Sequence, residues 1–156
     1  MIEVTIPGRE ALWIEHLVLD YNGTLAVDGE LLPGVGERLA ALASQLQVHV
    51  LTADTFGRAG DHLAGLPCQL TVLAAGAQDQ AKLEAVQRLG LRRTACIGNG
   101  RNDQLMLEQA ALGIAVILAE GAAVEALLRA DVVCTSILDA LDLLRSPLRL
   151  AATLRC

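Results

Sequence analysis

Short apolar runs alternate with longer stretches of helical periodicity along this chain, and no other feature constrains its fold as much. The apolar runs carry few charges and little polar alternation, and they lie at residues 17–19, 48–51, 70–73, 95–97, 114–117 and 132–134. Runs of this kind are typical of strands that are buried on both faces. Strands that alternate with helices predict βαβ units, and therefore a parallel sheet with right-handed crossovers.

Apolar residues recur at helical spacing between these runs, at residues 37–46, 80–89, 104–111, 122–129 and 137–144. Asp79 is expected to cap the second of these helices, and Gly90 to end it. Residues 2–6 alternate apolar and polar side chains, which predicts an N-terminal edge strand or hairpin. We therefore expect a three-layer, doubly wound α/β fold, and the length favours a single domain over residues 1–156.

Charge and cysteine content exclude several classes of protein. The chain has 18 acidic and 12 basic residues and a formal net charge of -6, so binding to nucleic acid or to an anionic membrane surface is not expected. Its four cysteines form no CxxC pair, which argues against a zinc site or a disulfide framework and suits a reducing cytoplasm. Because no membrane-spanning segment or signal peptide is recognisable either, we expect a cytoplasmic protein.

Polar residues follow several of the predicted strands. Asp20, Thr52 and Asn99 come at strand ends, Lys82 lies near the start of a predicted helix, and Asp103 lies on the turn after Asn99. The carboxyl ends of parallel strands meet at one edge of a sheet, which is where ligands bind. A carboxylate, a hydroxyl and an ammonium group at one edge suit phosphoryl transfer through an aspartyl nucleophile, with Mg²⁺ neutralising the phosphoryl oxygens.

The segments that carry these residues resemble the motifs of the haloacid-dehalogenase-like (HAD) phosphotransferases. Residues 20–25, Asp-Tyr-Asn-Gly-Thr-Leu, are similar to the first motif, and residues 98–103, Gly-Asn-Gly-Arg-Asn-Asp, are similar to the fourth. Thr52 and Lys82 fit the second and third motifs, and the four occur in the family's order. The resemblance implies a HAD-like Rossmannoid fold and a Mg²⁺-dependent phosphatase or phosphotransferase.

The same resemblance implies a role for each matching residue. Asp20 is the expected nucleophile, Thr52 and Lys82 are expected to assist it, and Asn22 occupies the position of the family's general acid and base. The residues expected to contact the phosphoryl group, the first two through their backbone, are Tyr21, Gly23, Thr52, Ala53, Lys82 and Asn102. Mg²⁺ is expected to be bound by Asp20, by the backbone carbonyl of Asn22, and by Asn99 or Asp103.

Two amides depart from the family's pattern. Asn22 stands where the phosphatases have an aspartate, and an amide cannot exchange a proton near neutral pH. Asn99 stands where the family usually has a metal-binding aspartate, which removes one negative charge and should weaken Mg²⁺ binding. We therefore expect slow turnover of poor leaving groups. The alternative is a catalytically impaired protein that uses the same crevice to bind phosphate, a nucleotide or a partner protein.

The spacing of the motifs leaves no room for a large cap domain. Only 31 residues separate Asp20 from Thr52 and 29 separate Thr52 from Lys82, so residues 27–35 form at most a short flap. The chain therefore resembles capless members of the family such as the soluble P-type-ATPase-like group, and residues 27–31 resemble the flap of the 3-deoxy-D-manno-octulosonate 8-phosphate phosphatases.

An open site has consequences for substrate and assembly. We expect a phosphorylated small molecule or a phosphoprotein as substrate. The open site either takes substrates on larger molecules or is covered by a neighbouring subunit of a homo-oligomer. The apolar segment 148–154 either serves such an assembly or packs on the chain's own sheet.

Several of these residues also have simpler interpretations. The Asn-Gly pairs at 22–23 and 99–100 favour ordinary turns, and Lys82 taken alone fits a solvated helix charge. Arg101 either contacts the substrate or points to water. The histidines show no ligand spacing and are expected to be structural or surface residues: His16, His49 and His62.

Overall fold

A six-stranded parallel sheet forms the centre of the computed structural model, which describes residues 1–54 and 57–156. From one edge to the other, its strands are β10 (Val132–Cys134), β9 (Leu112–Val116), β8 (Thr94–Gly98), β3 (His16–Asp20), β6 (Gln47–Thr52) and β7 (Gln69–Val72). Each of the six apolar runs forms the body of one strand, and all five strand pairs are parallel. The predicted α/β fold is confirmed.

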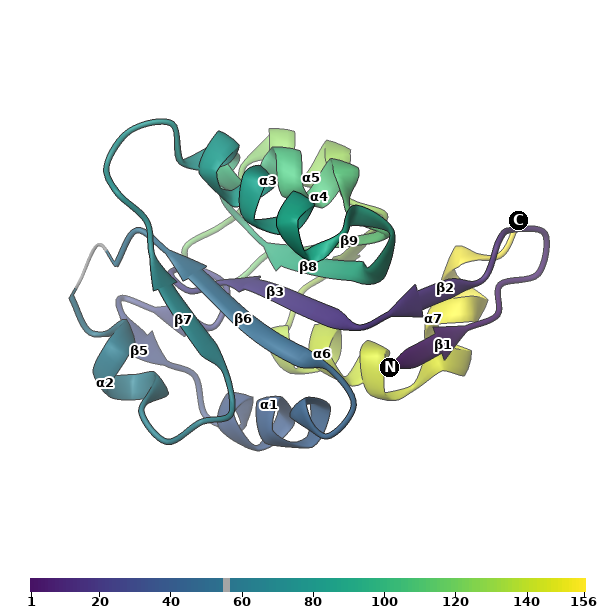
Figure 1. The fold of residues 1–156 in the computed structure, drawn as a ribbon, viewed down its shortest axis with the longest axis horizontal. Helices are drawn as coiled ribbons and strands as arrows, with labels where there is room; N and C mark the ends of the chain where they lie inside the picture. Colours follow the sequence, from purple (N-terminus) through teal and green to yellow (C-terminus); the bar gives the residue numbers. More distant parts are fainter. Residues whose placement is uncertain (55–56) are drawn as a thin grey trace.

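Helices cover both faces of this sheet (Figure 1). On one face lie α3 (Gln78–Leu89), α4 (Gln104–Gln109) and α5 (Val124–Arg129), and on the other lie α1 (Val35–Ala43), α2 (Ala59–Leu63) and α6 (Ile137–Arg145). Successive residues of β3 point to opposite faces, so that Leu17 and Leu19 enter one apolar cluster and Val18 enters the other. This explains why the strand sequences are continuously apolar.

The helix ends differ from those predicted. Gly90 does end α3, because its backbone N–H bonds to the carbonyls of Val86 and Gln87 at a φ of 102°. The predicted cap at Asp79 is wrong: α3 begins at Gln78, and the Asp79 carboxylate accepts the neighbouring N–H of Gln80 within the first turn. A short 3-10 helix, η1 (Leu91–Arg93), joins α3 to β8, and another, η2 (Arg101–Asp103), joins β8 to α4.

The N-terminal segment forms the predicted hairpin, apart from the main sheet. Its strands β1 (Ile2–Val4) and β2 (Leu12–Ile14) pair antiparallel, and β2 leads directly into β3. A helix that the sequence patterns did not predict, α7 (Pro147–Leu154), packs against β1 and α6. It buries Leu150 and Ala151, so the apolar C-terminal segment packs on the chain's own hairpin rather than on the main sheet.

A second, smaller hairpin follows β3. Its strands β4 (Ala26–Val27) and β5 (Glu30–Leu31) are joined by Asp28 and Gly29, which both adopt positive φ angles, of 52° and 79°. This short flap and α1 are the only elements between Asp20 and β6, so no cap domain interrupts that stretch. Among the residues that the structure describes, no helix has the length and apolar character needed to cross a membrane.

Candidate active site

The strand order places Asp20 where the winding of the sheet reverses. From β3 the chain runs through α1 to β6 and through α2 to β7. It then crosses by α3 to β8, which lies on the other side of β3. Such a switch point opens a crevice at the carboxyl ends of the strands. Asp20 ends β3 at this point, between Thr52 at the end of β6 and Gly98 at the end of β8.

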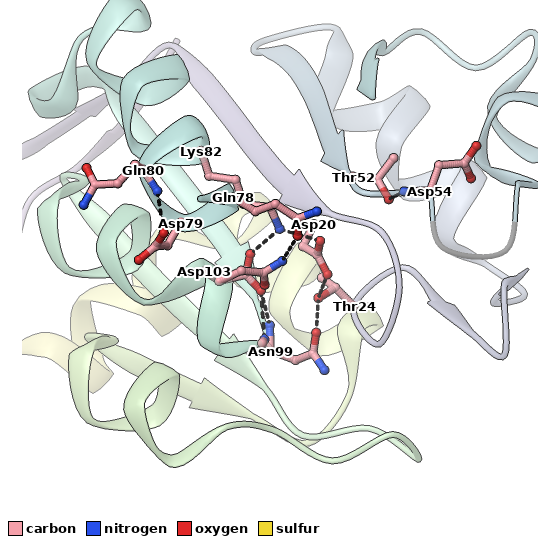
Figure 2. Close-up of polar contacts among 12 residues, drawn as sticks. Asp20, Thr24, Thr52, Asp54, Gln78, Asp79, Gln80, Lys82, Asn99 and Asp103 are labelled. Carbon is pink, nitrogen blue, oxygen red and sulfur yellow. Dashed lines mark hydrogen bonds and ion pairs between the residues drawn. The ribbon is translucent and has the colours of Figure 1, made fainter. Parts of the chain in front are cut away.

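Lys82 lies in the second turn of α3, and its ammonium group is enclosed between two carboxylates. Its Nζ donates to Oδ1 of Asp20 at 2.7 Å and to Oδ1 of Asp103 at 2.6 Å (Figure 2). The side chains of Lys82 and Asp103 are fully buried, and Asp20 is nearly so. Three motifs that are far apart in the sequence therefore meet at one ammonium group.

These three charges leave one negative charge in excess inside the protein. Burial and the charge of Asp103 together outweigh the ammonium of Lys82, and they raise the pKa of Asp20 from 3.8 to about 7. Burial alone would lower the pKa of Lys82, but the carboxylates of Asp103 and Asp20 raise it above its usual value. Lys82 is therefore charged, and the excess negative charge favours a further cation at this edge.

Asp103 also closes the loop that follows β8. Its Oδ2 accepts the backbone N–H of Asn99 at 3.0 Å and that of Gly100 at 2.8 Å. A Cβ atom at Gly98 would lie 2.5 Å from Cγ of Asp103, so this position requires glycine. The spacing of residues 98–103 thus has a physical reason, since one carboxylate folds back onto its own loop.

Thr24 joins the first and fourth motifs, a role that its place directly after Gly23 does not reveal. Its hydroxyl lies 3.3 Å from Oδ2 of Asp20 and 3.1 Å from Oδ1 of Asn99. Asn99 in turn donates from Nδ2 to the carbonyl of Gly121 at 3.0 Å, and its amide lies against Gly23, where a Cβ atom would be 2.3 Å from Nδ2. These contacts fix the orientation of the Asn99 amide.

Asn22 follows the expected nucleophile by two positions and carries an unpaired amide oxygen. Its Oδ1 is buried and has no hydrogen-bond partner within the described part of the chain. The turn around it is held by a bridge to Ala26 and by the bond from the N–H of Gly23 to the carbonyl of Ala26. Because an unpaired buried acceptor costs free energy, this oxygen is suited to accept a hydrogen bond from a bound molecule or to ligate a cation.

Thr52 lies at the crevice but apart from the lysine cluster. Its hydroxyl accepts the backbone N–H of Asp54 at 2.9 Å, and within the described residues it forms no hydrogen bond with Asp20 or Lys82. Figure 2 shows Thr52 and Asp54 set apart from the charged groups. The Asp54 carboxylate accepts an N–H at the start of α2, at 3.1 Å, so this acid has a structural role.

Tyr21 directs its side chain away from the charged cluster and toward the flap. The phenol donates to the carbonyl of Gly29 at 3.1 Å and lies 2.8 Å from Nδ1 of His62 on α2. Burial, with the charges of Glu30 and Asp54, raises the pKa of Tyr21 to about 12, so the phenol keeps its proton. The backbone of Tyr21, which directly follows Asp20, is among the groups that lower the pKa of that carboxyl.

The remaining candidates lie at the rim of the crevice. Asn102 donates from Nδ2 to Oε1 of Gln78 at 3.1 Å, which links η2 to the start of α3. Ala53, directly after Thr52, is partly buried. Arg101 is mostly exposed and lies 3.4 Å from Glu125, so in this structure it points to water rather than toward Asp20.

The oxygen atoms at this edge fit a hard divalent cation such as Mg²⁺. Asp20 and Asn99 offer a carboxylate and an amide oxygen, and Asn22 offers a side-chain oxygen besides its backbone carbonyl. Both oxygens of Asp103 are already engaged, one by Lys82 and one by its own loop. Within residues 1–54 and 57–156 no three His, Cys, Asp or Glu side chains group around a metal position.

Solved structures with the same fold are HAD phosphatases and hydrolases. The cobalt-bound deoxy-D-mannose-octulosonate 8-phosphate phosphatase of Haemophilus influenzae has a TM-score of 0.69 and 15% identity, over 86% of this chain and 88% of that one. A putative HAD-superfamily hydrolase of Legionella pneumophila reaches 0.71 at 20% identity, over 90% and 87%. The Moraxella catarrhalis 3-deoxy-D-manno-octulosonate 8-phosphate phosphatase, solved with magnesium, phosphate and the sugar, reaches 0.66 at 17% identity, over 86% and 87%. These likenesses establish the HAD-like fold.

Two curated proteins of Methanocaldococcus jannaschii are similar to this chain in sequence, and both are uncharacterized. MJ0073 is 44% identical over 84 residues, which make up 51% of this chain and 90% of that protein. MJ0072 is 46% identical over 39 residues, which make up 25% of this chain and 89% of that protein. No protein-family model matches the chain.

Proposed function

This chain belongs to the same family as the uncharacterized protein MJ0073, and we propose that it is a Mg²⁺-dependent phosphatase or phosphotransferase that forms an aspartyl phosphate on Asp20. The observation that carries the proposal is the buried ammonium of Lys82 between Asp20 and Asp103, at the carboxyl edge of a HAD-like sheet. Burying three charges together is costly, and a purely structural role does not require them at the switch point of the sheet.

The contacts of Asp20 indicate which oxygen reacts. Oδ1 is held by Lys82 at 2.7 Å, whereas among the described side chains Oδ2 has only the long 3.3 Å contact with Thr24 and is the freer nucleophile. A bond forms between Oδ2 and phosphorus, the bond to the leaving oxygen breaks, and water then attacks phosphorus to release phosphate and restore the carboxylate. Lys82 stays protonated throughout and offsets the charge of Asp20 and the phosphoryl oxygens.

Thr52 and the backbone of Tyr21 and Gly23 are proposed to hold the phosphoryl oxygens, together with Ala53 and Asn102 at the rim. The Thr52 hydroxyl accepts an N–H from Asp54 and donates to no other residue that the structure describes, so its proton is proposed to be donated to a phosphoryl oxygen. Mg²⁺ would be held by Asp20, Asn22 and Asn99, with Asp103 positioning the lysine. When bound, the metal would neutralise phosphoryl charge.

The amide of Asn22 leads us to expect slow phosphoryl transfer and slow hydrolysis of the aspartyl phosphate. An amide neither protonates a leaving oxygen nor takes a proton from the attacking water, so both steps proceed without the general acid and base that is typically worth about 10²–10⁴-fold. We therefore infer a preference for good leaving groups such as acyl and aryl phosphates. The unpaired Oδ1 of Asn22 can still accept a hydrogen bond from the substrate.

The substrate class follows from the open crevice. Several of the similar structures are octulosonate 8-phosphate phosphatases, which have the same fold at low identity. For this chain we propose a phosphorylated small molecule or a phosphoprotein, in the manner of the capless, soluble P-type-ATPase-like group. A second subunit that covers the crevice, and a cytoplasmic location, belong to the same proposal.

The test is to trap the aspartyl phosphate. The full chain is incubated with Mg²⁺ and acetyl phosphate, and its intact mass is measured beside that of an Asp20→Asn variant, which should fold normally and form no adduct. We expect a phosphoryl adduct on the wild type and faster hydrolysis of aryl than of alkyl phosphates. If neither acetyl phosphate nor beryllofluoride modifies the wild type, and an Asn99→Asp variant is also unmodified, the crevice is a binding site without turnover.

A further inference from the structure

A groove of about 440 Å³ lies at the opposite end of the sheet from Asp20. Its walls come from the loop of the first hairpin, from β2, from η1 and from the residues that follow α4. These segments precede β3, β8 and β9, so the groove lies at the amino edge of the sheet, whereas Asp20 lies at the carboxyl edge. Figure 1 shows the separation, with the β1–β2 hairpin at one end of the molecule and the tip of β3 toward the other.

Trp13 forms part of one wall of this groove and is 45% exposed. The alternation of β2 explains its orientation, because Ile14 is fully buried and the preceding side chain therefore points outward. Trp13 is the only tryptophan in a chain that has just three aromatic residues. A half-exposed indole in the wall of a groove offers a flat surface on which a planar ring can stack.

Arginines supply the charge of the groove. Arg9, Arg92 and Arg93 line it, against one carboxylate, that of Glu10. Arg93 is paired with Glu15 at 3.0 Å, but no ion pair or side-chain hydrogen bond joins the guanidinium group of Arg9 or Arg92 to another described residue. Glu10 and Glu15 therefore offset part of the charge of the three arginines, and a net positive charge remains in the groove of a chain whose net charge is -6.

We propose that this groove binds a mononucleotide, with the base on the indole of Trp13 and the phosphate between Arg9 and Arg92. The combination of a flat apolar surface and two free guanidinium groups matches a ligand that is planar at one end and anionic at the other. The volume lies within the range of roughly 300–1,000 Å³ that is usual for small-molecule sites. Leu12 and Leu91 complete the apolar part of the wall. The site is separate from the proposed reaction at Asp20.

Because Trp13 is the only tryptophan in the sequence, tryptophan fluorescence reports directly on this groove. The intrinsic fluorescence of the full chain is followed while AMP or GMP is added, and adenosine, ribose 5-phosphate and inorganic phosphate are added in parallel. We expect saturable quenching by the mononucleotides, and binding at least about tenfold weaker for each fragment, because each lacks one half of the recognition. Affinity should also fall as salt is raised, since the phosphate contact is ionic.

Variants separate this site from the catalytic crevice. Arg9→Ala and Arg92→Ala, both at exposed positions, should each weaken binding by about tenfold or more through loss of a charge-assisted hydrogen bond. Trp13→Ala, followed by calorimetry, should weaken binding as well, whereas Asp20→Asn and the remote Arg149→Ala should leave it unchanged. Circular dichroism checks that each variant is folded.

Three results would overturn the proposal: no quenching by either mononucleotide, equal quenching of the wild type and both arginine variants, or equal affinity for inorganic phosphate and AMP. Preferential binding of an acidic peptide over both mononucleotides would assign the groove to a protein partner instead. None of these outcomes bears on whether Asp20 is phosphorylated, so the two proposals can fail separately.

Discussion

Replacement of Lys82 by methionine removes the one positive charge that lies between Asp20 and Asp103. Methionine has a similar unbranched shape, so the change deletes the charge without opening a large cavity. Two buried carboxylates then face each other without a counter-ion. Loss of one member of a buried ion pair typically costs about 3–5 kcal/mol of unfolding free energy, and we expect a loss in this range near neutral pH.

The loss should depend on pH in a defined direction. In the wild type the pKa of Asp20 is about 7, and Lys82 is one of the groups that lower it, so the variant should have a still higher value. A carboxyl whose folded pKa exceeds its unfolded pKa binds more protons in the folded state, and stability then rises as the pH falls toward the unfolded value of 3.8. The gap between variant and wild type should therefore narrow from about pH 8 to about pH 5.

Urea unfolding with EDTA present, followed by circular dichroism at several pH values, measures this gap. Arg88→Met is the matched control, because Arg88 lies on the exposed side of the same helix and its loss should cost less than about 0.5 kcal/mol. Lys82→Arg should lose far more activity than stability, since the planar guanidinium does not replace a compact ammonium. A Lys82→Met variant within about 1 kcal/mol of the wild type at every pH would refute the buried-charge account.

Three further predictions test other parts of the structure. Gly98→Ala should disrupt the loop and abolish phosphorylation of Asp20, because its Cβ would lie 2.5 Å from Cγ of Asp103; intact-mass analysis with acetyl phosphate checks this. Burial lowers the pKa of His16 and of His49 below 6.5, so these two groups bind more protons in the unfolded state, and their contribution to stability should fall as the pH drops below 6.5. Urea unfolding should show this as a stability difference between the wild type and a His49→Gln variant, which shares all other titrating groups, that shifts in favour of the variant as the pH drops. Asn22→Asp should raise the turnover of alkyl phosphates by about 10² or more, and unchanged turnover with Mg²⁺ still bound would contradict the role assigned to residue 22.

Much of the fold was predictable because its signals are local. Each strand of the six-stranded sheet contains an apolar run, and the four inner strands are buried because helices cover both faces of the sheet; Gly90 ends α3 at a positive φ. The apolar pattern of residues 148–154 does not by itself predict α7, although Ser146 directly precedes the helix and Pro147 suits its first turn. Its contact with β1 joins the two ends of the chain, which no local pattern encodes.

Within the site, the sequence by itself determined which chemical groups follow which strands. Asp20, Thr52 and Asn99 had to meet at one edge, because the carboxyl ends of parallel strands share an edge. Lys82 is expected at the same edge because it lies near the start of a predicted helix, and its resemblance to the family's third motif implies its role.

Only the tertiary structure decided how these groups are paired. It placed one lysine between two acids, turned Asp103 back onto its own loop, used Thr24 to link Asp20 with Asn99, and left the amide oxygen of Asn22 without a partner. Local spacing in the sequence cannot determine such contacts, because they join residues as many as 75 positions apart. They also depend on which buried polar groups are left to form hydrogen bonds with one another once the helices have packed on the sheet.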